Sequence, residues 1–174
     1  MRYAKIEKCE CTNGLGWGVS LYVQGCSRQC KGCFNKQTWD FSGGEYFGAP
    51  EHIYISNLLA EKPEVLTRFS ILGGEPLEEN NLLELASIIA RARITNKNLK
   101  IWLFTGYTWE ELEERIKDKP DNYLSTILEN IDVLVDGPFI QEQKDLTLKF
   151  AGSRNQRIID VQRTLCQDNI ILFQ

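Results

Sequence analysis

The sequence has no long hydrophobic run, since none of its apolar stretches exceeds four residues. A helix that spans a membrane needs about 20 consecutive apolar residues, so no such helix is expected. Residues 1–5 include two basic side chains and no apolar core, which argues against a secretory signal. We therefore expect a cytoplasmic protein that does not contact a membrane.

Basic residues are in the minority. Lys and Arg number 20 against 24 Asp and Glu, which gives a net charge of −4 and a pI near 5.2. Proteins that bind nucleic acid mainly through phosphates need an excess of Lys and Arg, so we expect no direct nucleic-acid binding. The 174 residues, 43% hydrophobic and 25% charged, are typical of a single globular domain over 1–174.

Histidine is nearly absent, with His52 alone, whereas the chain has six cysteines, at positions 9, 11, 26, 30, 33 and 166. The cytosol keeps thiols reduced, so a disulfide framework is not expected. Clustered cysteines in such a protein indicate a metal site or catalysis instead.

Apolar runs alternate with helical patterns along the chain. Strands are predicted at 19–23, 68–72, 99–104, 131–135 and 169–173, and helices at 81–93 and 109–117 and near 50–60 and 121–130. This alternation is typical of βαβ units and a mainly parallel sheet. A complete eight-fold barrel takes about 250 residues, so we predict an open, partial (β/α) barrel or a doubly wound sheet.

In either fold the site should lie at the C-terminal ends of the strands. Four turns that bear glycine or polar residues follow the predicted strands. They contain Cys26, then Gly73-Gly74-Glu75, then Thr105-Gly106-Tyr107, and finally Asp136-Gly137. We therefore expect these four turns to meet on one rim.

The spacing of Cys26, Cys30 and Cys33 is C-x3-C-x2-C, which is compact enough for three thiolates to surround one centre. Thiolates favour iron–sulfur clusters or zinc over hard cations. Three ligands leave one iron of a 4Fe–4S cluster open, whereas a purely structural cluster normally has four cysteines. The alternative is a structural zinc site, whose fourth ligand would be His52, Cys166, Cys9 or Cys11.

This motif and its surroundings resemble the radical S-adenosylmethionine superfamily and, within it, the activases that generate a glycyl radical on anaerobic ribonucleoside-triphosphate reductases. The resemblance runs in order through residues 13–16, 24–26, 32–39, 73–77, 102–107, 132–137 and 152–157. The cysteine motif is specific to the superfamily, and the ordered set indicates the activases.

The resemblance implies a radical-type partial barrel that carries a 4Fe–4S cluster and S-adenosylmethionine as cofactors. One electron from a flavodoxin-like donor would cleave the sulfonium to a 5′-deoxyadenosyl radical. That radical would take a hydrogen atom from a glycine of the large reductase subunit, which is thus both partner and substrate. The metal ligands implied are Cys26, Cys30 and Cys33.

The same resemblance implies the residues that contact the cofactor, which are Gly32, Phe34, Gly73, Gly74, Glu75, Thr105 and Asp136. Phe34 would lie against the adenine, although many superfamily members have the aromatic residue where this chain has Gly32. Glycines allow close backbone approach to a ligand, and Glu75 offers a carboxylate to the ligand's ammonium group. Pro138 stands where some activases have a lysine that meets the ligand's carboxylate.

Other functions remain open from the sequence. The chain could act on a small molecule, as 7-carboxy-7-deazaguanine synthase does in queuosine-precursor synthesis, or could activate another glycyl-radical enzyme. A zinc or electron-transfer module is a third alternative. Cys9, Cys11 and Cys166 are interpreted as structural or incidental, as buried free cysteines commonly are.

Overall fold

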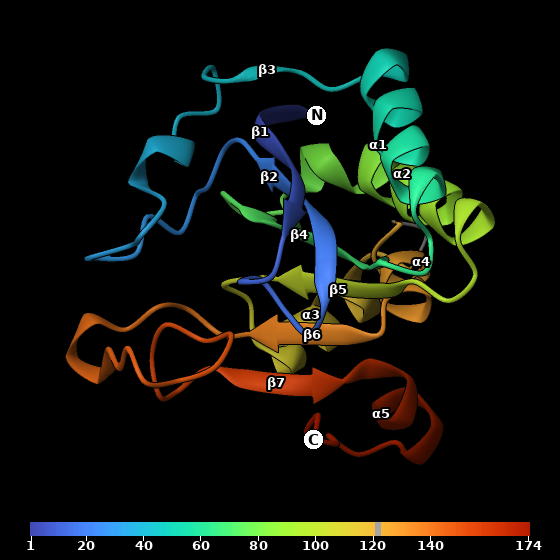
Figure 1. The fold of residues 1–174 in the computed structure, drawn as a ribbon. Helices are drawn as coiled ribbons and strands as arrows, with labels where there is room; N and C mark the ends of the chain where they lie inside the picture. Colours follow the sequence, from blue (N-terminus) through green and yellow to red (C-terminus); the bar gives the residue numbers. More distant parts are fainter. Residues whose placement is uncertain (121–122) are drawn as a thin grey trace.

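A computed structural model describes residues 1–120 and 123–174 (Figure 1). The described residues form a seven-stranded sheet flanked by helices. The strands are β1 (Arg2–Glu10), β2 (Trp17–Val23), β3 (Glu45–Tyr46), β4 (Leu66–Gly73), β5 (Lys100–Phe104), β6 (Val133–Asp136) and β7 (Arg157–Asp160). The helices are α1 (Ala49–Glu61), α2 (Leu82–Thr95), α3 (Trp109–Asp118), α4 (Leu124–Asn130) and α5 (Val161–Gln167).

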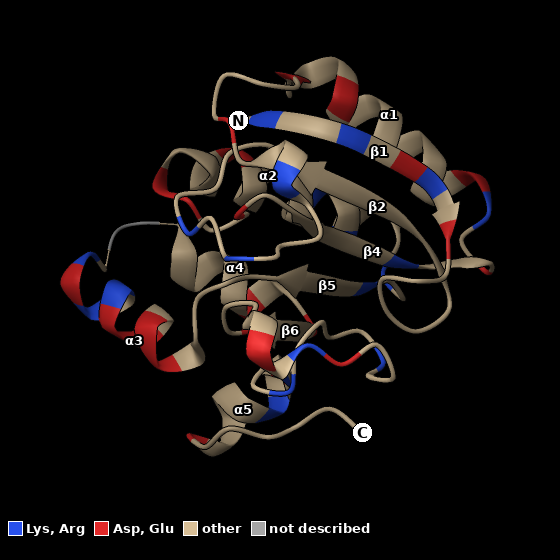
Figure 2. Ribbon diagram, turned by 90° about the vertical axis from the view of Figure 1, so that its left-hand side faces the viewer, with Lys and Arg blue, Asp and Glu red and all other residues tan. Residues whose placement is uncertain are grey.

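The strand order is β3-β1-β2-β4-β5-β6-β7. The four central strands, β2, β4, β5 and β6, are parallel to one another. β1 and β7 pair antiparallel with β2 and β6 at the two sides, and the short β3 pairs antiparallel with β1. Figure 2 shows β1, β2, β4, β5 and β6 side by side in this order. The mixed α/β architecture and the parallel centre of the sheet are therefore confirmed.

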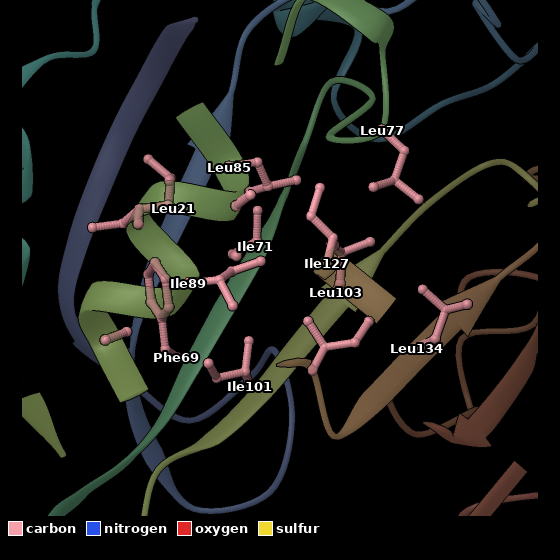
Figure 3. Packing of buried hydrophobic residues seen from close by; sticks show 14 of the residues in the cluster. Leu21, Phe69, Ile71, Leu77, Leu85, Ile89, Ile101, Leu103, Ile127 and Leu134 are labelled. Carbon is pink, nitrogen blue, oxygen red and sulfur yellow. The ribbon is translucent and has the colours of Figure 1, made fainter. Parts of the chain in front are cut away.

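Helices cover one face of the sheet, where the main core lies. Leu21, Ile71 and Leu103 point from successive strands toward Ile89 of α2 and Ile127 of α4 (Figure 3). Each of these side chains is fully or almost fully buried. The apolar side chains of the central strands cover this face, which is why short apolar runs mark these strands in the sequence.

The opposite face is polar under β2 and β4 and apolar under β5 and β6. Arg68 is fully buried there and donates to the carbonyl oxygen of Gly14 at 2.6 Å and to the Glu10 carboxylate. Trp102 packs beside it against Phe150 and Phe173. The loop after β1 and the C-terminal segment therefore close this face of the sheet.

The structure corrects several element boundaries. The strand predicted at 169–173 is reduced to one isolated bridge, between Ile159 and Leu172. Strands β1, β3 and β7 and helix α5 were not predicted, because charged residues interrupt β1 and the other three elements are short. The helix predicted near 121–130 is found as α4 from Leu124, and its first two predicted positions lie outside the described residues.

Helix α3 begins with the capping box that its sequence indicates. The Glu111 N–H donates to the Thr108 hydroxyl at 3.3 Å, and the Thr108 N–H donates to the Glu111 carboxylate at 2.7 Å. Asn81 precedes α2, but its side chain makes no cap hydrogen bond and donates instead to the carbonyl oxygen of Glu75 at 3.2 Å. No described helix is long and apolar enough to cross a membrane.

Candidate iron–sulfur site

A cavity of about 640 Å³ opens where the four central strands end. The connections that follow these strands gather on one side of the molecule (Figure 1). The residues predicted for the site that line the cavity are Cys26, Cys30, Cys33, Phe34, Gly73, Gly74, Glu75 and Thr105. The structure thus brings together the turns after β2, β4 and β5, which lie up to 79 residues apart in the sequence (26 to 105). The fourth predicted turn, after β6, reaches the cavity through Gly137.

The cysteine loop begins directly after β2 and is fixed by backbone hydrogen bonds. The Gly25 N–H donates to the Thr38 carbonyl at 2.8 Å, and the Cys26 N–H donates to the Trp39 carbonyl at 3.1 Å. The hydroxyl and N–H of Ser27 both donate to the Glu78 carboxylate, at 2.5 and 2.7 Å. These bonds close the loop at both ends and attach it to the turn that follows β4.

The three thiols differ in their surroundings. Cys26 is buried, and burial raises the pKa of its thiol, although backbone hydrogen bonds from Gln29 and Arg28 act in the opposite direction. Cys30 and Cys33 are half-buried, and the Cys33 sulfur accepts a hydrogen bond from the Asn35 N–H at 3.3 Å. A cluster would therefore be covered on its Cys26 side and reachable from the other two cysteines.

No group of three or more His, Cys, Asp or Glu side chains among the described residues is arranged to hold a metal ion. A cubane cluster differs from a single ion, because each cysteine binds a separate iron and the sulfurs can stand farther apart. Three thiols on the wall of one cavity provide a donor set of the type that such a cluster uses.

Gly73 and Gly74 let two parts of the chain meet. A Cβ atom on Gly74 would lie 2.3 Å from the Gly25 carbonyl oxygen, and one on Gly73 would lie 2.8 Å from the Val23 carbonyl oxygen. The Glu75 N–H then donates to the Gly25 carbonyl at 2.8 Å. The backbone that closely approaches these glycines is therefore the end of β2 and the start of the cysteine loop, whereas the sequence predicted a ligand there.

Glu75 lies deep in the site and is 1% exposed. Its carboxylate accepts hydrogen bonds from the Leu77 N–H at 3.0 Å, the Thr105 hydroxyl at 2.7 Å and the Gly106 N–H at 2.7 Å. Burial raises the pKa of this carboxyl group, and the hydrogen bonds and the Arg28 charge oppose the rise. A carboxylate has about four acceptor positions, so Glu75 keeps one for a further donor.

Phe34 and Gly32 contact the connection between β6 and β7. The ring of Phe34 packs edge-on against Phe139 with 5.2 Å between centroids, and the Lys144 ammonium lies 5.0 Å from its centre. Gly32 has a φ of +79°, and a Cβ there would overlap the Gln141 side chain. Phe34 remains 55% exposed and lines the cavity, whereas Gly32 stands outside the lining.

Asp136, which was predicted to contact the cofactor, does not line the cavity. Its buried carboxylate accepts from the Trp109 N–H at 2.8 Å and from the Arg157 guanidinium at 2.5 Å. Arg157 also donates to Glu110 at 2.7 Å. These contacts give Asp136 a positioning role, because they hold the start of α3 against β7.

None of Cys9, Cys11, Cys166 and His52 is among the described residues that line this cavity. The three cysteines are exposed, so the expectation that they are buried small side chains is wrong. His52 is buried instead and pairs with the Glu84 carboxylate across α1 and α2. His52 therefore links the two helices through Glu84.

Comparison with known proteins agrees with the donor set. A family model described as a 4Fe-4S single cluster domain matches residues 12–159. A Vibrio cholerae protein is 37% identical over 158 residues, which cover 91% of this chain and 97% of that protein. A Haemophilus influenzae protein is 35% identical with the same coverage, and a phage T4 protein is 31% identical over 91% of this chain and 93% of its own length. All three are named anaerobic ribonucleoside-triphosphate reductase-activating protein.

The chain belongs to this family of activating proteins. The resemblance inferred from the ordered motifs is therefore confirmed. The family match begins at residue 12 and ends at residue 159, so it spans the strands and turns that build the cavity.

Several residues of this activating-protein site were not predicted from the sequence. Arg28 lines the cavity between Cys26 and Cys30, and Glu78 holds the cysteine loop. Phe139, Phe150 and neighbouring residues of the β6–β7 connection form an apolar wall. The sequence signal for Arg28 was its place inside the cysteine motif, but its partners come from a distant turn.

Proposed function

We propose that the chain cleaves S-adenosylmethionine reductively and thereby generates a glycyl radical on an anaerobic ribonucleoside-triphosphate reductase. The whole chain, 1–174, would act as one radical S-adenosylmethionine domain, and its sheet would be the partial barrel of that class. Cys26, Cys30 and Cys33 would each bind one iron and leave the fourth iron to the amino-acid end of the ligand. The large reductase subunit would be the substrate, and a flavodoxin-like protein would supply the electron.

The observation that carries this proposal is the meeting of three thiols and the Gly73-Gly74-Glu75 turn in one cavity. A 4Fe–4S cluster held by Cys26, Cys30 and Cys33 would supply the electron that cleaves the sulfonium to methionine and a 5′-deoxyadenosyl radical. A cavity of about 640 Å³ is in the size range of small-molecule sites. Family membership agrees with this chemistry, because the relatives are named for activating the reductase.

The chain's own residues would bind the ligand and shield it. Glu75 has one acceptor position left for an ammonium group, and the exposed ring of Phe34 offers a stacking surface for adenine. Phe139, Phe150 and Leu148 add further apolar carbon to the cavity lining. Such a wall would limit access of water to a reactive radical.

The proposal can be tested by anaerobic reconstitution with iron and sulfide. We expect about four irons per chain and a reduced-state EPR signal that changes when S-adenosylmethionine is added. Cys30→Ala should abolish formation of 5′-deoxyadenosine, whereas Cys11→Ala is the matched control and should retain it, because Cys11 lies outside the cavity. One bound zinc and no sulfonium cleavage would indicate a zinc module instead.

The substrate is tested by adding the large reductase subunit under the same reducing, anaerobic conditions. A glycyl doublet in the EPR spectrum, dependent on S-adenosylmethionine, is the expected result. Cleavage of S-adenosylmethionine without that doublet would contradict the assigned substrate. It would favour a small-molecule substrate or another glycyl-radical enzyme.

A further inference from the structure

Two of the described side chains that line the cavity are charged, Arg28 and Glu75. They stand next to each other at the turn after β5. A methyl group built on Gly106 would lie 2.5 Å from Arg28 Cδ and 3.4 Å from Glu75 Oε2. The polar end of the cavity therefore presents one cation and one anion side by side.

Arg28 is held in place from outside the cavity. Its guanidinium carbon lies 4.1 Å from the centre of the Tyr107 ring, and Nη2 donates to the Glu111 carboxylate at 2.8 Å. Arg115 lies over the same ring at 4.4 Å, but it is not part of the cavity lining. Stacking and ion pairing thus fix the Arg28 guanidinium before any ligand arrives.

Most donors of Arg28 are uncommitted. A guanidinium has five N–H bonds, and among the described residues only Glu111 accepts a hydrogen bond from it. Nε in particular is buried with no partner in the described part of the chain. A buried donor without a partner is costly, so an acceptor supplied by a ligand would stabilise this arrangement.

An adjacent cation and anion match the two charges of an α-amino acid. Glu75 has one acceptor position left for an ammonium group, and Arg28 offers the planar donor pair that suits a carboxylate. We propose that Arg28 recognises the carboxylate at the amino-acid end of S-adenosylmethionine. This inference rests on the proposed function and assigns the residue that selects that end of the ligand.

The test compares two sulfonium ligands, S-adenosylmethionine and its decarboxylated analogue, on the cluster-loaded full chain. Their dissociation constants are measured by anaerobic equilibrium dialysis for wild type, Arg28→Gln and Arg115→Gln. In Arg28→Gln we expect S-adenosylmethionine to bind about tenfold to a hundredfold more weakly and the analogue to be little affected, since a hydrogen bond to a charged group contributes about 1.5–3 kcal/mol. The dissociation constant of the analogue divided by that of S-adenosylmethionine should therefore fall.

Arg115→Gln is the matched control, since it removes the other cation from the Tyr107 ring and should leave the ratio unchanged. Arg28→Lys keeps the charge without the planar donor pair, and its ratio should be intermediate. If the Arg28→Gln protein binds less iron than wild type, the Arg28→Lys protein is used for the comparison instead.

If Arg28 had a purely structural role, its replacement would weaken the binding of both ligands equally. An unchanged ratio in Arg28→Gln and Arg28→Lys would therefore overturn the inference. If cluster-loaded wild type binds neither ligand, the proposed function itself fails and the inference fails with it. If wild type binds S-adenosylmethionine and the Arg28 variants have the same ratio of dissociation constants as wild type, the proposed function stands and only the role of Arg28 is rejected.

Discussion

Because Gly74 has no side chain, the turn after β4 can pack closely against the turn after β2. The Gly25 carbonyl oxygen lies 2.3 Å from the position that a Cβ atom of Gly74 would take, and it accepts a hydrogen bond from the Glu75 N–H at 2.8 Å. Sequence reasoning identified this glycine but assigned its close approach to a ligand. The actual neighbour could not be predicted, because it depends on how two strand ends align in the sheet.

We expect Gly74→Ala to lower the free energy of unfolding by about 2–3 kcal/mol, because the added methyl group forces the backbone to shift. Urea unfolding of the reduced chain without cluster would measure this. Gly48→Ala is the matched control, since the nearest atoms to a Cβ there are 4.0 Å away. A Gly74→Ala chain as stable as the Gly48→Ala chain would contradict this account of the turn.

Arg28 illustrates what sequence cannot supply at the residue scale. Its position between two cysteines was visible, but Tyr107 and Glu111, which fix its guanidinium, belong to the turn after β5 and to α3. The cysteines and Gly-Gly-Glu were predictable because local spacing defines them. A side chain whose orientation is set by distant partners is found only in the folded chain.

At the scale of elements, the β6–β7 connection packs against the cysteine loop. Phe34 meets Phe139, and Lys31 lies 3.5 Å from the Glu142 carboxylate. Gln141, in the short 3-10 helix Gln141–Gln143, occupies the space over Gly32. We call this contact between residues 30–34 and residues 139–152 the clasp.

Loss of one ring from the clasp should loosen the cysteine loop as well as the connection. Phe139→Ala is expected to speed amide hydrogen exchange in residues 29–35 severalfold, because an aromatic pair contributes about 0.5–1.5 kcal/mol. Leu146→Ala is the control, since Leu146 lines the cavity mouth, is 78% exposed and has no ring contact. Faster exchange confined to 139–144 would show that the two segments open independently.

Helix α3 is tied to β7 by a charged group of three residues. Figure 2 shows the acidic positions of α3 in red. Glu110, near the start of this helix, pairs with Arg157 at 2.7 Å. Hydrogen bonding to Arg157 lowers the pKa of Glu110 from 4.5 to about 2. A carboxyl group with a lowered pKa adds stability above its unfolded pKa and loses it as the pH falls toward the folded value.

We therefore expect the wild-type free energy of unfolding to fall more steeply than that of Glu110→Gln between about pH 4.5 and pH 3. The effect should be small, since Glu110 is 57% exposed and solvent screens the pair. Urea unfolding at several pH values would measure both curves. Parallel curves would mean that the pair does not contribute in solution.

Prediction of elements from the sequence succeeded where apolar residues are concentrated. Strands β2, β4, β5 and β6 lie in the middle of the sheet, where most of their residues are buried, so short apolar runs mark them in the sequence. β1 was missed because Lys5, Glu7 and Lys8 alternate with apolar residues on a half-exposed strand. β7 was missed because four residues, two of them charged, give too short a pattern.

For the whole molecule, a bound cluster should stabilise the fold, because a group that binds only the native state shifts the unfolding equilibrium. We expect reconstituted protein to melt at least about 5 °C above the chain without cluster. Removal of the cluster by air or a chelator should reverse this shift. Cys30→Ala should show no shift on reconstitution, whereas Cys166→Ala should behave as wild type, because Cys166 lies on α5, away from the cavity.

The order of the central strands has a consequence for synthesis. β2, β4, β5 and β6 lie side by side in the same order in which the ribosome makes them. The cysteine loop and its hydrogen bonds to residues 38–39 can form early, whereas residues 139–152 emerge among the last. The loop is therefore uncovered throughout most of translation, and the clasp can close only after nearly all of the chain has been made.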